Sequence, residues 1–330
     1  MACVKRVTLS YREDAVGGEV SAQPKIVGQS PPEISGQTAI EQARHLVLLI
    51  HGYNNDTRAA ADAYEGFHAR QRDLDDRGPA DPASGSRYAD GRTFVEVYWP
   101  GDAAWGLLSF LFYMGSIKHA IQTAERLAGY LAEHVGNAVR IDIVAHSMGC
   151  RLGLELLRAL ENRPRAPRVE RIVFMAGAAP TFMLEQRSPP RRLRPCYDRM
   201  LLGGARSLYS GADKVLAWAF PAGQSLASGA EGWLPTALGH AYWSDPAIPI
   251  NLGQTENPSA GHSDYWGWND AAKPLQCATK AAREVHDYLQ FPSAGDRAIG
   301  HRTVVESNEL EARAHVTLRE MVGREIAIYA

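Results

Sequence analysis

The sequence predicts an α/β fold in three layers, a mostly parallel sheet of roughly eight strands with helices on both faces. The first observation is a continuous apolar run at residues 45–50, which is typical of a strand covered on both faces of a parallel sheet. The second is the succession of an apolar run at residues 139–143, a sharp turn, and a helical pattern at residues 150–159. The third is the alternation of further strand and helix patterns along the chain, which indicates parallel strands joined by helices.

The N-terminal part begins with a half-buried strand. Residues 4–11 alternate between apolar and polar side chains and are rich in β-branched residues. The polar segment that follows is broken by prolines and leaves room for one short strand at residues 25–28. After the buried strand at 45–50, either Asn55 or Asp56 can cap a helix at residues 57–72.

The remaining elements follow in the same alternating order. A strand at residues 93–99 ends at a Pro-Gly pair, and a helix at 117–132 follows with apolar residues at helical spacing. After the helix at 150–159 we expect strands at 171–176, 205–210 and 247–252, and a closing helix at 271–289.

These elements divide the chain into three parts. Residues 1–45 contain the N-terminal strands, 46–290 form the core, and 291–330 are a C-terminal extension to which the sequence assigns no role. Irregular segments near 100–116, 181–204 and 221–247 are predicted to be loops or lids. The first of these carries Trp105, Phe110 and Phe112 at the strand end where ligands of open α/β sheets bind, so it either lines a substrate pocket or begins an ordinary core-facing helix.

Composition is ordinary for a globular protein with a substantial core. Of the 330 residues, 45% are hydrophobic and 22% are charged, and the formal net charge is −2, which gives no reason to expect nucleic-acid binding. The four cysteines are scattered without a C-x-x-C pair, so neither a disulfide framework nor a zinc site is indicated. Two arginine clusters, at 163–171 and 187–194, are interpreted as solvated, although the second could meet an anionic group.

The N-terminus lacks the apolar core of a signal peptide, and no apolar run reaches the roughly 20 residues that span a bilayer. We therefore expect a cytoplasmic protein without a transmembrane segment. Leaderless export, contact with a membrane surface and the oligomeric state stay open.

Ser147 stands at the apex of the turn between the strand at 139–143 and the helix that follows. A serine there projects its hydroxyl from the sheet edge, and the backbone N–H of Met148 points to the same place from a helix N-terminus. Ala145-His146-Ser147-Met148-Gly149 resembles the nucleophile elbow of α/β-hydrolases, with Ala145 in place of the first glycine. A small side chain suffices at that position, because strand and helix pack closely there.

Further motifs carry the same resemblance. His51-Gly52 directly follows the third strand, where the family places an oxyanion loop, and the N–H of Tyr53 would complete the oxyanion hole with that of Met148. The alternative is a glycine turn with a hydrogen-bonded histidine. Asp213 follows the strand at 205–210, where the family holds its acid, although it could also simply cap a helix.

The resemblance implies that His262, in a glycine-flanked loop after the last strand, is the base. His240 is the second choice. His146 is expected to be structural, with its side chain leaving the elbow in the opposite direction, and it is also included with Trp105, Phe110 and Phe112 among candidate pocket residues. Asp245 and Asp264 are the alternatives for the acid.

The chain looks most like a bacterial esterase-like branch of the superfamily. The resemblance implies hydrolysis of a small-molecule or lipid-like carboxylic ester by Ser147, His262 and Asp213 through an acyl-enzyme, with no metal or organic cofactor. An acyltransferase, a thioester or amide hydrolase, and a binding protein that retains the fold are the alternatives. Halide and epoxide chemistry need a carboxylate at the elbow, where this chain has Ser147.

Overall fold

The computed structural model describes residues 4–13, 19–53, 55–75, 87–89, 91–101, 113–185, 193–221, 235–244, 248–267 and 275–291. The candidate pocket residues Trp105, Phe110 and Phe112 lie outside these ranges, as do Asp245 and residues 292–330. Of the second arginine cluster, Arg194 is described and forms an ion pair with Asp198.

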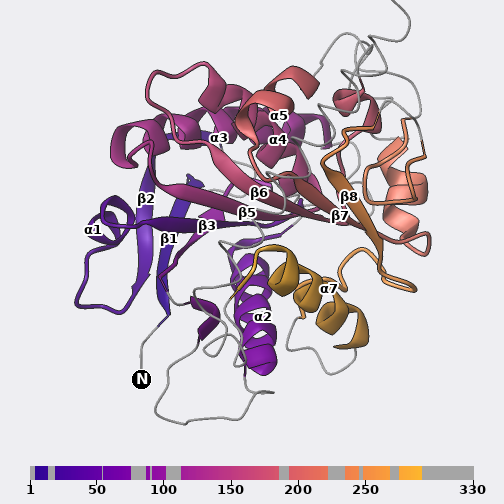
Figure 1. The fold of residues 1–330 in the computed structure, drawn as a ribbon, viewed down its shortest axis with the longest axis horizontal. Helices are drawn as coiled ribbons and strands as arrows, with labels where there is room; N and C mark the ends of the chain where they lie inside the picture. Colours follow the sequence, from indigo (N-terminus) through magenta and orange to yellow (C-terminus); the bar gives the residue numbers. More distant parts are fainter. Residues whose placement is uncertain are drawn as a thin grey trace, which may run out of the picture.

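An eight-stranded sheet forms the middle layer, in the order β2-β1-β4-β3-β5-β6-β7-β8 (Figure 1). Among the described strands, only the β1 and β2 pair is antiparallel; the other neighbouring strands are parallel. This confirms the predicted α/β architecture. The strands are β1 (Lys5–Arg12), β2 (Val20–Ser30), β3 (His45–Ile50), β4 (Thr93–Tyr98), β5 (Arg140–His146), β6 (Val169–Met175), β7 (Ala205–Tyr209) and β8 (Leu252–Glu256).

Helices cover both faces of this sheet. In Figure 1, α3 (Tyr113–His134), α4 (Met148–Glu161) and α5 (Arg194–Met200) lie on one side, and α2 (Thr57–Asp75) and α7 (Leu275–Tyr288) lie on the other. The small helix α1 (Gly36–Glu41) packs against β1 and β2. Short helical turns complete the described elements: η1 (Arg87–Ala89), η3 (Thr181–Leu184) and η4 (Val215–Ala219).

The centre of the sheet is fully buried. All six residues of β3 are buried, as its continuous apolar sequence predicts, because β4 and β5 flank it and helices cover its faces. The N-terminus of α2 is capped by Asp56, whose Oδ1 accepts a hydrogen bond from the Ala59 N–H at 2.7 Å. No helix within the described ranges is long and apolar enough to cross a membrane.

Several element boundaries differ from the prediction. The predicted strand at 247–252 is wrong: β8 begins at Leu252, because the Leu252 N–H bonds the Pro249 carbonyl in a turn and leaves Ile250 fully exposed. β2 is longer than the predicted 25–28, since its polar residues pair along the whole of β1 at the sheet edge. The helices α1 and α5 were not predicted, and α5 lies in the segment 181–204 that was expected to be a loop or lid.

Candidate active site

Ser147 occupies a strained turn between β5 and α4. Its backbone has φ 54° and ψ −125°, a region that residues other than glycine rarely adopt. Three hydrogen bonds hold this conformation: the Ser147 N–H donates to the Met175 carbonyl at 2.9 Å, and the Ser147 carbonyl accepts from the N–H groups of Cys150 and Ala178, each at 3.0 Å. The sharp turn therefore has a fixed geometry, which sets the direction of the Ser147 side chain.

The structure brings Ser147, His262 and Asp213 into one hydrogen-bonded chain. The Ser147 Oγ lies 2.7 Å from His262 Nε2, and His262 Nδ1 lies 2.8 Å from Asp213 Oδ2. An ionised carboxylate only accepts hydrogen bonds, so the proton of neutral His262 sits on Nδ1 and leaves Nε2 as an acceptor for the serine hydroxyl. Ser147 is 5% exposed and Asp213 is fully buried.

The two carboxylate oxygens of Asp213 bind different partners. While Oδ2 faces His262, Oδ1 accepts hydrogen bonds from the N–H groups of Val215 and Leu216, both at 3.0 Å. These two donors lie at the start of η4. One side chain thus makes both the capping contacts and the contact with His262.

His146 holds the loop that carries His262. Its Nε2–H donates to the backbone carbonyl of His262 at 2.7 Å, and the two imidazole rings are 5.2 Å apart. The expectation that this side chain leaves the elbow in the opposite direction is wrong, because the His262 loop folds back beside it. It thus supports the loop, and its 6% exposure is close to the 5% of Ser147.

The other candidates for acid and base take different positions. The Asp264 Oδ2 accepts from the Gly261 N–H at 2.7 Å and so closes the turn around His262. His240 donates its backbone N–H to Ala237, and it is His262 that contacts Ser147.

Close backbone packing brings residues 51–53, here called the His-Gly loop, against Ser147. A Cβ on Gly52 would lie 2.8 Å from the Ser147 Cβ and 2.9 Å from the His146 Nδ1. A Cβ on Gly149 would lie 2.5 Å from the His51 carbonyl oxygen. Only glycine allows these approaches, and they bring the segments that carry the Tyr53 and Met148 amides together at Ser147. Burial raises the pKa of the Tyr53 phenol to about 12, so that side chain stays neutral.

Arg12, the last residue of β1, is not among the residues expected from the sequence. Its guanidinium reaches the His-Gly loop, and the residue is only 9% exposed. A single arginine at the end of a sheet strand carries no local signal of this contact.

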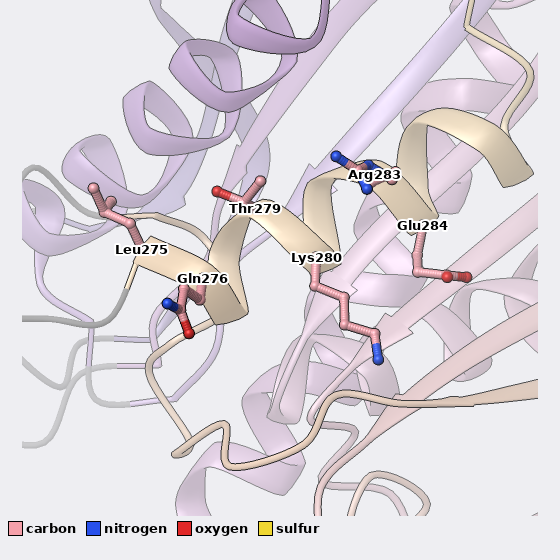
Figure 2. A pocket seen from close by; sticks show the side chains of 6 residues that line it. All are labelled: Leu275, Gln276, Thr279, Lys280, Arg283 and Glu284. Carbon is pink, nitrogen blue, oxygen red and sulfur yellow. The ribbon is translucent and has the colours of Figure 1, made fainter.

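An open depression on the surface of α7 lies apart from these residues (Figure 2). Its lining consists of Leu275, Gln276, Thr279, Lys280, Arg283 and Glu284, all from this one helix. Ser147, His262 and Asp213 are not among them, so we assign the depression no chemistry. In the described part of the chain, no group of three or more His, Cys, Asp or Glu side chains could hold a metal ion.

Residues 32–185 match the family model described as "Alpha/beta hydrolase of unknown function (DUF900)". No curated protein matches the chain.

Among solved structures, the product of lin2722 from Listeria innocua is 10% identical, with a TM-score of 0.40 and coverage of 76% of this chain and 96% of that one. A lipase-esterase related protein from Clostridium acetobutylicum is 11% identical (TM-score 0.36; 75% and 96% covered). A pyrethroid hydrolase from Sphingobium faniae is 13% identical (TM-score 0.36; 75% and 98% covered). Such distant likenesses assign no substrate to this chain.

Proposed function

We propose that this chain, whose residues 32–185 match an α/β-hydrolase family model, is a serine hydrolase that cleaves carboxylic esters through an acyl-enzyme. The observation that carries the proposal is the continuous hydrogen-bonded chain from Ser147 Oγ through His262 to Asp213, with contacts of 2.7 and 2.8 Å. A serine hydroxyl is a poor nucleophile at neutral pH, and a base in direct contact with it, oriented by a carboxylate, is the arrangement that activates it.

In the proposed first half-reaction, Ser147 Oγ forms a bond to the carbonyl carbon while its proton moves to His262 Nε2. The imidazolium that results is stabilised by Asp213, and the oxyanion accepts hydrogen bonds from the N–H groups of Tyr53 and Met148. The carbon–oxygen bond to the alcohol then breaks, and His262 returns the proton to the leaving alcohol. An acyl group remains on Ser147.

The second half-reaction repeats these steps with water as the nucleophile. His262 takes a proton from the water as its oxygen bonds to the acyl carbon, and the carboxylic acid leaves as Ser147 recovers its proton. The charge that develops is again on the former carbonyl oxygen. Every proton transfer uses a group that the chain itself supplies, so the proposed reaction needs no cofactor.

A fluorophosphonate probe tests the proposed nucleophile. Wild-type protein should be labelled on Ser147 with a stoichiometry of one, and Ser147→Ala should abolish labelling and ester hydrolysis. The matched control is Ser263→Ala, which removes an exposed hydroxyl next to His262 and should label normally. An unlabelled wild type, or Ser147→Ala labelled as well as wild type, would refute the proposal.

A substrate panel tests the bond that is cleaved. Matched ester, thioester and amide substrates with the same acyl group should rank with the ester highest in kcat/KM. Added alcohol acceptors should not increase acyl consumption beyond hydrolysis. A higher kcat/KM for the thioester would indicate a thioester hydrolase instead. Transfer to the alcohol in preference to water would indicate an acyltransferase.

A further inference from the structure

Arg12 reaches the His-Gly loop from the end of β1, which is separated from β3 by β4. Its Nε–H donates to the Trp99 carbonyl at 3.1 Å, one Nη2–H donates to the Asn55 carbonyl at 2.6 Å, and its Nη1–H donates to Thr57 Oγ1 at 3.3 Å. The same Nη2 lies 3.2 Å from His51 Nε2. The planar guanidinium thus joins the end of β4, the loop after β3 and the start of α2.

The hydrogen bonds of His51 fix which of its nitrogens carries a proton. The Trp99 backbone N–H donates to His51 Nε2 at 3.3 Å, so Nε2 is an acceptor, and the proton on Nδ1 is donated to the Gly52 carbonyl at 2.7 Å. Complete burial and the nearby positive charge of Arg12 lower the His51 pKa well below its ordinary value, which keeps the ring neutral.

The backbone of His51 is held with equal firmness. Its N–H donates to the Tyr64 hydroxyl at 3.0 Å, and its carbonyl accepts from the indole Nε1–H of Trp99 at 2.9 Å. The His51 and Trp99 rings stack at 5.6 Å with an interplanar angle of 15°. Every polar group of His51 is therefore used in fixing the peptide that leads into Gly52 and Tyr53.

We propose that Arg12 is a positioning residue, which fixes the Tyr53 amide for the oxyanion by holding His51 and Asn55 on either side of it. The inference rests on the proposed function, since it assigns Arg12 a role in that reaction. The geometry supports it because the Gly52 backbone directly abuts Ser147, so a shift of the loop changes the distance between the Tyr53 amide and the reacting carbonyl. Donors to an oxyanion act only over a narrow range of distance.

The test compares Arg12→Gln and Arg12→Lys with the control Arg6→Gln. Arg6 lies on the same strand, but its guanidinium binds the carboxylates of Glu96 and Glu65 at the end of the strand away from Ser147. We expect Arg12→Gln to lower kcat for p-nitrophenyl butyrate and the rate of fluorophosphonate labelling by about tenfold or more, toward the ~10²–10³ that loss of an oxyanion donor costs. KM and the final labelling stoichiometry should stay as in wild type.

Arg12→Lys should recover part of the rate, because an ammonium keeps the charge but cannot span the Trp99 and Asn55 carbonyls. Arg6→Gln should label at the wild-type rate. The proposal is overturned if Arg12→Gln reacts as fast as Arg6→Gln, or if its rate falls only in proportion to a lower labelling stoichiometry, which would show loss of folded protein. If the wild type is labelled on Ser147 but Arg12→Gln reacts at the rate of Arg6→Gln, the role of Arg12 is refuted and the proposed function stands. If the wild type is not labelled, the proposed function itself fails.

Discussion

Asp213 is the residue whose replacement best separates chemistry from folding. Its Oδ1 caps η4 and its Oδ2 faces His262. In Asp213→Asn, the amide oxygen can still accept from Val215 and Leu216, while the amide nitrogen faces His262 Nδ1 and favours the wrong tautomer. We expect kcat to fall by about 10⁴ with an unchanged thermal midpoint. Ester turnover and a calorimetric scan are measured on the same variant. Near-normal turnover would move the acid role to Asp264 or Asp245.

Among single residues, the sequence indicates the members of the proposed triad more readily than the residues that support them. Ser147 and Asp213 each follow a strand pattern, and the family resemblance points to His262. The contact of His146 with the His262 carbonyl depends on how a distant loop folds back. The contacts of Arg12 depend on which strand lies beside β4.

Among the elements, α2, β4 and β1 are joined by three polar side chains, of which Glu96 and His68 are buried and Arg6 is partly exposed. Glu96 on β4 contacts His68 of α2 at 3.2 Å and Arg6 of β1 at 2.8 Å. Burial alone would raise the Glu96 pKa, but the hydrogen bond from His68 and the charge of Arg6 outweigh it, and the net pKa is lowered. Burial, aided by Arg6, lowers the His68 pKa although Glu96 opposes this.

Both groups therefore bind fewer protons in the folded than in the unfolded chain, so the free energy of unfolding should fall as the pH falls. The decline should begin near the unfolded histidine pKa of about 6.5 and continue through that of glutamate, about 4.3. At neutral pH, Glu96→Gln should lower the free energy of unfolding by about 1.5–3 kcal/mol. In urea titrations, the free energy of unfolding of this variant should also depend less on pH than that of the wild type. Glu65 is half-exposed, so Glu65→Gln is the control and should lower the free energy of unfolding by at most about 1 kcal/mol. Equal losses in the two variants would contradict this account.

The elements also show where periodicity misleads. β3 and β4 are predicted within one residue because every side chain in them is buried and most are apolar. β8 is a polar sheet-edge strand, LGQTE, and the more apolar residues before it form an exposed turn instead. Apolar character marks burial, and a strand at the edge of a sheet needs little of it.

Over the whole molecule, the candidate site uses most of the width of the sheet. The ends of β3, β5 and β7 and the loop after β8 each supply a residue, and β1 supplies Arg12. We therefore expect loss of fluorophosphonate labelling and loss of far-UV circular dichroism to share one midpoint in urea. Loss of labelling at clearly lower urea would mean that the His262 loop opens before the sheet unfolds. The Ser263→Ala variant, labelled at each urea concentration, controls for effects of urea on the probe.

The fold class of such a molecule follows from alternation along the chain, whereas its strand order and the distances in its site are set by tertiary contacts. Gly52 illustrates the difference. Its place in a His-Gly pair is visible in the sequence, but the 2.8 Å that would separate a Cβ there from the Ser147 Cβ depends on the pairing of β3 with β5.

The position of β1 in the sheet also bears on where the folding unit begins. The family match starts at residue 32, after β1 and β2, although β1 pairs along the whole length of β4. A fragment trimmed to start at that residue would leave β4, six buried residues reading TFVEVY, as a bare edge. Apolar edges of this kind recruit strands from other chains and aggregate. The two N-terminal strands thus protect the sheet from self-association, in addition to delivering the guanidinium to the loop beside Ser147.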